Sequence, residues 1–227
     1  MIWLIVAAVV FVGSHLLLAG TPLRGKLAIA LTESGYLGLF SVTAAVAIVW
    51  LAWAYAVAPY QELWASGPWL KTLTWIVMIP AVFFFVLGFA TPNPTAVQAE
   101  RLFAEADVVQ GVLRITRHPV MWGLGLWGIA HIIANGDLAS LIFFGSLVLL
   151  ALGGAANQQS RKRLLLGASW DRFAAATSYW PFGAIVAGRN KLVWSEIGLW
   201  RLLLAIVAYI ALVAFHALVI GVSPMPQ

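Results

Sequence analysis

Long runs of apolar residues, separated by short polar stretches, dominate this chain of 227 residues. Most of these runs carry few or no charges and reach about 17–25 residues, the length that an α-helix needs to cross the hydrocarbon core of a bilayer. The pattern predicts about six transmembrane helices, over residues 2–20, 36–58, 70–90, 119–135, 138–156 and 200–221. The turn-forming triplet Asn135-Gly-Asp137 lies between the fourth and fifth runs, so these two should form a tight helical hairpin.

The connections after the third and fifth runs are long enough to hold structure of their own. The segment 96–103 is expected to form a short surface helix. Helical spacing also continues from Leu164 to Tyr179, with Trp170 and Phe173 near one face, and Trp180-Pro181 ends it. This second segment is predicted to be an amphipathic helix that lies in the membrane interface and caps the bundle.

Composition supports this reading, because 63% of the residues are hydrophobic, 9% are charged and the mean hydropathy is +0.95. A soluble domain of this length cannot bury so much apolar surface. We therefore expect an all-α polytopic membrane protein with a single domain over residues 1–227, in contact with membrane lipids. The first run has no basic segment before it and is predicted to be a retained helix. Cysteine is absent, which excludes disulfides and thiolate metal sites.

The basic residues gather in loops that alternate along the chain. Twelve of the thirteen fall on one side of the predicted topology: Arg24, Lys26, Arg101, Arg114, Arg117, Arg161, Lys162, Arg163, Arg172, Arg189, Lys191 and Arg201. Only Lys71 falls on the other side. The positive-inside rule then predicts cytoplasmic long loops and two non-cytoplasmic termini. The pI of about 9.9 reflects this topology and contact with anionic lipid, so no nucleic-acid partner is expected.

Four histidines are the candidate ligands within this apolar chain: His15, His118, His131 and His216. Neutral imidazole is a common ligand of iron and other transition metals, although a lone membrane histidine can equally make a single hydrogen bond between helices. No Asp or Glu lies inside a predicted span, which argues against a proton relay. Depth along the helices pairs His15 with His118 and His131 with His216.

Arg114, Arg117 and His118 stand together just before the fourth run. Cationic side chains at a helix N-terminus can hold an acidic group such as a haem propionate or a phosphate, but basic residues at this position also follow from topology alone. Glycines in the fourth and fifth runs favour close helix packing, and they could also leave space for a flat ligand. These glycines are Gly123, Gly125, Gly128, Gly153 and Gly154.

Several motifs carry a resemblance to a known family. The segments Arg114-Ile-Thr-Arg-His-Pro119, Trp127-Gly-Ile-Ala-His131 and Asn135-Gly136 resemble the NnrU family and the plastid 15-cis-ζ-carotene isomerases related to it. The resemblance extends over almost the whole chain. Further matching segments are Ser14-His15, Leu23-Arg24, Trp170-Asp-Arg-Phe173, Pro181-Phe-Gly-Ala-Ile185, Gly188-Arg189 and Phe215–Pro224.

The resemblance implies a haem b protein with two histidine ligands, which match His15 and His131. It also implies either cis–trans isomerisation of a polyene, an apolar small molecule, or a role in nitrite and nitric oxide respiration in a bacterial inner membrane. Arg114, Arg117 and His118 are then expected near the haem's acidic groups. The plastid enzymes have a cysteine before the second histidine, where this chain has Gly128.

A weaker resemblance points to isoprenylcysteine carboxyl methyltransferases, in which an Arg-His-Pro region helps to hold S-adenosylmethionine. The acidic pair of that pattern is replaced here by Ser160-Arg-Lys-Arg163. The alternatives to a haem protein are therefore a methyltransferase of a lipid substrate and a membrane scaffold without enzymatic activity.

Overall fold

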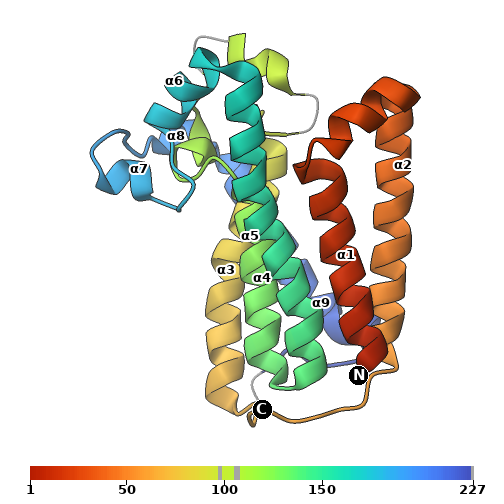
Figure 1. The fold of residues 1–227 in the computed structure, drawn as a ribbon. Coiled ribbons are helices and arrows are strands. Elements are labelled where there is room, and N and C mark those ends of the chain that lie inside the picture. The colour runs from red at the N-terminus through yellow and green to blue at the C-terminus, as the bar shows by residue number, and fades with distance from the viewer. Residues whose placement is uncertain (97–98, 105–107, 226–227) are drawn as a thin grey trace.

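The chain folds into helices and loops in a computed structural model that describes residues 1–96, 99–104 and 108–225. Six long helices form the bundle, and short helices lie at one end of it (Figure 1). The long helices are α1 (Ile2–Gly20), α2 (Leu23–Ala56), α3 (Pro68–Ala90), α4 (Pro119–Asn135), α5 (Leu138–Leu166) and α9 (Leu199–Ile220). The short ones are η1 (Glu100–Ala104), η2 (Gly111–Arg114), α6 (Ala168–Ala176), α7 (Gly183–Val186) and α8 (Trp194–Ile197).

The six long helices correspond to the six predicted spans, so the expected all-α membrane architecture is confirmed. Within the described residues, five of them are long and apolar enough to cross a membrane. The sixth, α4, has 17 residues and is the shortest. Its neighbour α5 has Asp137 as N-cap, whose carboxylate accepts a hydrogen bond from the Ser140 amide, so the predicted turn between the two helices is present.

Three boundaries differ from the sequence prediction. Helix α2 begins at Leu23 instead of residue 36 and bends at Thr32, whose φ of 67° is not helical. Helix α5 continues to Leu166, ten residues beyond the predicted end, because its polar last turns pack against the loops at that end. The capping helix is therefore shorter than expected, and α6 covers Ala168–Ala176. The helix expected over 96–103 lies partly outside the described residues.

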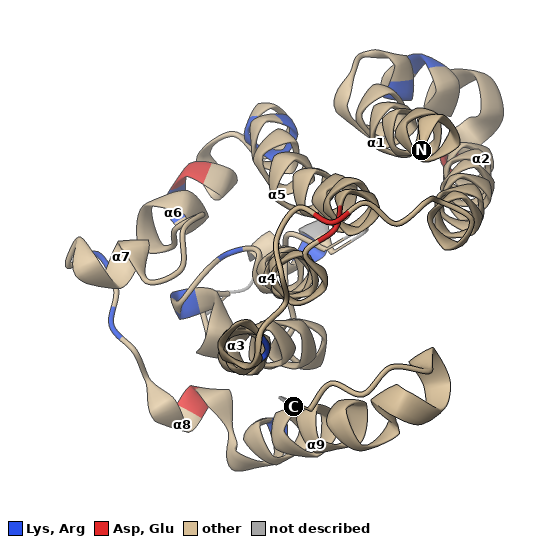
Figure 2. Cartoon of the chain, turned by 90° about the horizontal axis from the view of Figure 1, so that it is seen from below, with Lys and Arg blue, Asp and Glu red and all other residues tan. Residues whose placement is uncertain are grey.

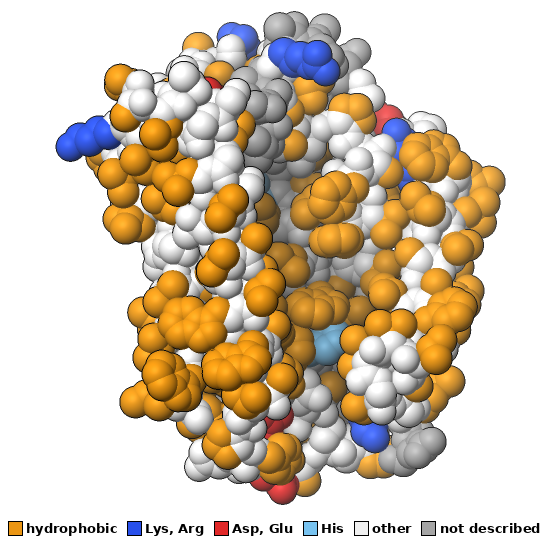
Figure 3. Space-filling view, turned by 90° about the vertical axis from the view of Figure 1, so that its right-hand side faces the viewer, with side chains coloured by type: hydrophobic (Ala, Val, Ile, Leu, Met, Phe, Trp, Pro, Cys, Tyr) orange, Lys and Arg blue, Asp and Glu red, His pale blue; other side chains and the backbone are white. Residues whose placement is uncertain are grey.

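The bundle has two distinct ends. The start of α1, the end of α9 and the loop 57–67 lie at one end, here called the terminal end. The described parts of the connection between α3 and α4 and the segment 167–198 lie at the other, here called the basic end (Figure 1). Most Lys and Arg side chains visible in Figure 3 also gather at the basic end, while many apolar side chains lie between the two ends on the side shown. This distribution matches the charge asymmetry predicted from the loops.

Packing between neighbours arranges the helices in a row, in the order α2, α1, α5, α4, α3 and α9. Seen end-on, the row curves so that α2 and α9 face each other across an opening (Figure 2). Figure 3 looks at the molecule from the α2 side and shows a hollow there, in which a histidine side chain is visible. The buried core divides into one cluster around α1, α2 and α5 and another around α3, α4 and α9.

Two glycines of α4 explain its close approach to its neighbours. A Cβ atom on Gly123 would lie 2.7 Å from the Phe85 backbone nitrogen of α3, and one on Gly128 would lie 2.7 Å from a Val148 methyl of α5. Gly153 and Gly154 have nothing within 4 Å of such an atom. The predicted packing role is therefore correct for α4, and it is wrong for the pair in α5.

Candidate functional site

His131 and His216 lie together near the terminal end of the bundle. Each is four residues from the end of its helix, α4 or α9, and their ring centroids are 6.4 Å apart with an interplanar angle of 27°. The ring of His131 also contacts Trp127 and Phe144, at centroid distances of 4.6 and 4.9 Å. The structure thus brings together the pair that depth predicts.

His15 occupies a different part of the molecule. It lies thirteen residues after the start of α1, about 20 Å along the helix axis. Its ring packs against Phe11 at 4.7 Å and against Phe40 of α2 at 5.4 Å. It contacts neither His118, with which depth pairs it, nor His131, with which the family resemblance pairs it.

The three histidines within the long helices share one hydrogen-bonding pattern. In each, Nδ1 lies at hydrogen-bond distance from a backbone carbonyl: 2.7 Å from Phe11 for His15, 2.8 Å from Trp127 for His131 and 2.7 Å from Val222 for His216. A carbonyl oxygen can only accept, so Nδ1 carries the proton and Nε2 keeps its lone pair when the ring is neutral. A second nitrogen fixed in this way is typical of metal-ligating histidines.

A cavity of about 160 Å³ adjoins the paired histidines, between α3, α4 and α9. Apolar groups form most of its lining, and the polar members include Thr74, Asn135, Tyr209 and Ser223. The charged member of the lining is Lys71, the basic residue that the sequence places apart from the other twelve. The cavity therefore offers two imidazoles and one ammonium group in mainly apolar surroundings.

A larger apolar groove, of about 740 Å³, runs between α1 and α5 and reaches α4 at Ile132. Its lining is aliphatic except for Ser146, and includes Val9, Leu141 and Leu149. The groove opens at the side of the bundle, where lipid surrounds a membrane protein. Its volume is in the range of about 300–1,000 Å³ found for ligand pockets, and its chemistry suits an apolar chain.

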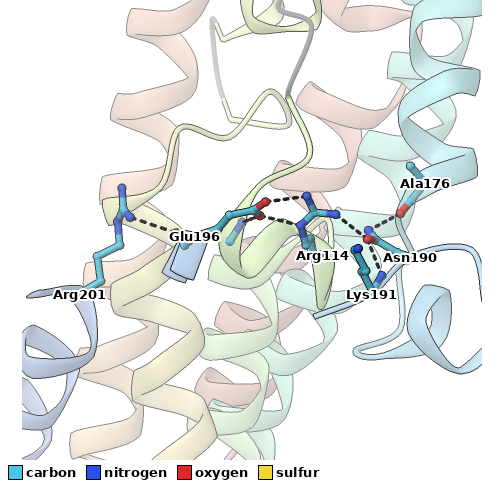
Figure 4. Close-up of polar contacts among 7 residues, drawn as sticks. Arg114, Ala176, Asn190, Lys191, Glu196 and Arg201 are labelled. Carbon is cyan, nitrogen blue, oxygen red and sulfur yellow. Dashed lines mark hydrogen bonds and ion pairs between the residues drawn. The ribbon is translucent and has the colours of Figure 1, made fainter. Parts of the chain in front are cut away.

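At the basic end, Arg114 is engaged in an internal ion pair (Figure 4). Its Nε and Nη2 donate to the two carboxylate oxygens of Glu196 at 2.6 and 2.7 Å, and Nη1 donates to the Asn190 side-chain oxygen at 2.8 Å. Glu196 also accepts from the Gly111 amide at 2.9 Å. These hydrogen bonds hold the pKa of the Glu196 carboxyl below its ordinary value. Arg114 thus ties η2 to α8, and a ligand's acidic group would have to displace Glu196.

Arg117 is also directed into the protein. Its guanidinium donates to Gln159 of α5 at 2.9 Å and to the Ala174 and Thr177 carbonyls at 3.1 and 2.8 Å. Burial, together with the charge of Arg189, lowers its pKa to about 10. The side chain lines a polar cavity of about 380 Å³ beside Gln159 and Ser160. Its main visible role is to fasten α5 and the end of α6 to the start of α4.

His118 lies at the N-cap of α4 and is almost completely buried, with 2% of its surface exposed. Neither ring nitrogen has a hydrogen-bond partner among the described residues, and the nearest ring is that of Tyr179, at 5.8 Å. Burial, with smaller contributions from the charges of Arg117 and Lys162, lowers its pKa to about 3. His118 is therefore a neutral, buried side chain and not a member of a cationic cluster open to a ligand's acidic group.

Lys162 is a residue whose role the sequence did not reveal. It appears as one member of a basic run, yet only 1% of its surface is exposed. Its ammonium group donates to the Pro94 carbonyl at 2.8 Å and the Ala96 carbonyl at 3.3 Å, and lies 5.9 Å from the Phe103 ring centroid. Lys162 thus joins α5 to the loop after α3, which only the fold could show.

Comparison with known proteins gives the chain a family. It matches the family described as NnrU protein over residues 3–224. The chain belongs to the NnrU family. This membership agrees with the motifs around His15, His118 and His131. No solved structure matches the chain.

Two curated relatives of this NnrU protein are chloroplastic 15-cis-zeta-carotene isomerases. The one from Zea mays is 37% identical over 82 residues, and the one from Arabidopsis thaliana is 35% identical over 82 residues. Each alignment covers 36% of this chain and 22% of the relative, so the chain spans about a fifth of the length of these proteins. Neither is a methyltransferase, and the weaker resemblance to that class gains no support.

Proposed function

We propose that this NnrU protein is a haem-binding membrane protein that isomerises a cis double bond in an apolar polyene. The observation that carries the proposal is the state of the membrane histidines, whose Nδ1 atoms lie at hydrogen-bond distance from carbonyls, so that Nε2 keeps its lone pair in the neutral ring. Similarity to two carotene isomerases supports the reaction class. The link to nitrite and nitric oxide respiration stays a prediction.

The donor set fits haem iron, which commonly takes neutral imidazole as an axial ligand. Metal-binding clusters of three or more His, Cys, Asp or Glu are absent from the described residues, so a metal that takes two protein ligands suits this chain better than a zinc site with three or four. The cavity beside His131, of about 160 Å³, is smaller than a porphyrin requires. A porphyrin held by His131 would therefore have to extend beyond this cavity.

The chain's own residues would divide the work between two places. His131 would hold the iron, and the aromatic rings of Trp127 and Phe144 fix the orientation of its imidazole. The apolar groove between α1 and α5 would admit the polyene from the lipid and exclude water. When bound, the haem supplies iron whose reduced form can engage a double bond and so ease rotation about it.

The test uses the full chain, expressed with ample haem and purified in detergent. Absorption spectra with and without dithionite, together with extraction of the haem, measure the haem-to-protein ratio. The protein is then placed in liposomes with a polyene that contains a cis bond, and the isomers are separated by chromatography under reducing and oxidising conditions.

We expect about one haem per chain and reduction-dependent isomerisation, both lost in His131→Ala. A protein with no Soret band would overturn the haem assignment. A haem-loaded protein that leaves every cis-polyene unchanged would overturn the isomerase assignment and leave haem binding intact. Leu141→Trp, which narrows the groove and leaves every histidine in place, should reduce turnover without reducing haem content.

A further inference from the structure

We propose that the polar cavity between α5 and α6 binds the phosphate group of an anionic phospholipid, from the leaflet at the basic end. The cavity has a volume of about 380 Å³, and its lining includes Arg117, Gln159, Ser160 and Arg163. Helices α5 and α6 pack against each other at this end of the bundle (Figure 1). The site lies at the opposite end of α4 from His131, and it does not depend on haem binding.

The first support is a buried positive charge that has no counter-ion among the described residues. Arg117 is 8% exposed, and its guanidinium donates to the Gln159 side chain and to two backbone carbonyls, all of them uncharged. Its Nε is buried and makes no hydrogen bond with the described residues. A buried charge without an opposite partner is costly, so an anion in the cavity would stabilise this side chain.

A second arginine adds to the same charge. Arg189 donates to the Ala174 and Thr177 carbonyls at 3.4 and 3.1 Å, and the same two oxygens accept from Arg117. The C-terminus of a helix such as α6 carries only about half a negative charge, whereas two full guanidinium charges meet here. An excess of positive charge therefore remains beside the cavity.

The wall of the cavity offers further groups to a phosphate. The Gln159 side-chain oxygen accepts from Arg117, which leaves its NH2 group as a donor. Ser160 and Arg163 follow on α5, and both are exposed. Arg163 pairs with Asp171 at 3.4 Å, with both side chains mostly exposed, and a pair of this kind is weak enough for a phosphate to displace. Asp171 also lines the cavity, so its charge opposes an anion there.

The surface of α5 beyond the cavity indicates that the phosphate belongs to a lipid. Ala156 and Ser160 share a face of α5 with Gly153 and Leu149, because residues three and four apart lie on one side of a helix. A Cβ on Gly153 would have nothing within 4 Å, and Leu149 is 67% exposed, so this face is open.

The length of this open face fits one leaflet. From Ser160 to Leu149 the helix rises about 17 Å, close to the roughly 15 Å of hydrocarbon in half a bilayer. A phospholipid with its phosphate in the cavity would therefore lay an acyl chain along α5. Basic pockets between helices on the cytoplasmic side, where the charge asymmetry places this end, are typical sites for acidic lipid headgroups.

The experiment measures lipid binding by the full-length protein after exchange into a neutral detergent. Dioleoyl phosphatidylglycerol, dioleoyl phosphatidylcholine and inorganic phosphate are titrated separately, and native mass spectrometry and the melting temperature report binding. We expect each chain to retain one phosphatidylglycerol, which raises the melting temperature. Phosphatidylcholine and inorganic phosphate should bind at least about 10-fold more weakly, the first because its cationic choline opposes the arginines and the second because it has no acyl chain.

Arg163→Gln tests the cavity, with Arg172→Gln as its matched control. Both arginines are exposed at the basic end, but Arg163 lines the cavity and Arg172 does not. Arg163→Gln should weaken phosphatidylglycerol binding about 10-fold, the scale of one hydrogen bond to a charged group, and Arg172→Gln should leave it unchanged. Asp171→Asn should instead tighten binding about 2- to 5-fold, because it removes the opposing charge.

Ser160→Glu separates loss of the site from misfolding. The position is exposed, so the lipid-free variant should melt at the wild-type temperature, while the added carboxylate should abolish lipid retention. Phosphatidylglycerol binding that is equal in the wild type, Arg163→Gln and Ser160→Glu would overturn the proposal, as would equal weakening by Arg163→Gln and Arg172→Gln. Inorganic phosphate that binds as tightly as phosphatidylglycerol would overturn the lipid assignment in favour of a free-phosphate site.

Discussion

Two adjacent polar residues at the start of α4 have different surroundings in the fold, although the sequence places both in one cationic cluster. His118 and Arg117 are adjacent, yet Arg117 makes three hydrogen bonds while the imidazole of His118 makes none with the described residues. A buried polar group without a partner costs free energy. Because a buried imidazole without a partner resists protonation, His118 should make the stability of the fold depend on pH.

Replacing His118 with Leu should remove an acid sensitivity of the protein. The folded pKa of about 3 lies below the ordinary 6.5, so the unfolded chain takes up a proton first and stability is lost as the pH falls from about 6.5 toward 3. Between pH 7.5 and pH 5 the wild type should therefore lose about 2 kcal/mol of its free energy of unfolding to this histidine, from 1.36 kcal/mol per pH unit. The variant should not show this loss. Thermal unfolding in detergent at pH 7.5 and 5 measures this, and equal pH dependence in both proteins would contradict it.

Replacing Glu196 with Gln should weaken the attachment of α8 to η2. The partly buried bidentate pair with Arg114 is expected to contribute about 1–2 kcal/mol at pH 7. Because the pKa of Glu196 is lowered in the fold, this stability is present above the ordinary carboxyl pKa and disappears as the pH falls through the lowered one.

Asp171→Asn is the matched control, since Asp171 pairs with Arg163 at 3.4 Å with both side chains mostly exposed. An exposed pair contributes about 0–1 kcal/mol. Melting temperatures of the two variants between pH 7 and 4 provide the comparison, and an equal cost for both at pH 7 would contradict the structural role given to Glu196.

At the scale of helices, the apolar pattern predicted the number of long helices correctly, but it did not predict their lengths. Helix α5 runs ten residues past its predicted end, since Gln158, Gln159 and Lys162 find partners in loops that the pattern cannot place. Glycine content was equally ambiguous. Gly123 and Gly154 both lie in apolar helices, and only the packing shows that the first touches backbone and the second faces open space.

A pair of alanine substitutions tests this difference. Gly123→Ala would place a methyl group 2.7 Å from the Phe85 nitrogen and 2.9 Å from the Ala81 oxygen, and overpacking of this kind costs about 1–3 kcal/mol. Gly154→Ala has no such contact and should gain about 0.5–1 kcal/mol from the lower backbone entropy of alanine. Thermal unfolding midpoints should move in opposite directions, and two shifts of the same sign would contradict the observed α3–α4 packing.

For the whole molecule, charge asymmetry gives an orientation that labelling can test. The chain has no cysteine, so single cysteines can be introduced at exposed positions of each end, with Gln61→Cys at the terminal end and Ala187→Cys at the basic end. The positive-inside rule predicts that an impermeant maleimide labels Gln61→Cys in intact spheroplasts and Ala187→Cys only after lysis. The reverse pattern would show that the termini are cytoplasmic.

The sequence by itself determined the class of protein, the six apolar helices, the basic end and the family. These properties follow from composition, periodicity and local motifs, each of which is encoded within one segment of the chain. It also singled out the histidines, whose placement within apolar spans is unusual for ionisable groups.

Only the tertiary structure decided which of these groups meet. Depth along separate helices suggested His131 with His216, but their 6.4 Å separation depends on the positions of α4 and α9 around α3. The internal roles of Arg114, Arg117 and Lys162 likewise depend on carboxylates and carbonyls that are remote in the chain. The sequence does not distinguish a basic side chain that faces lipid headgroups from one that binds a buried partner, because only folding brings the partner close to it.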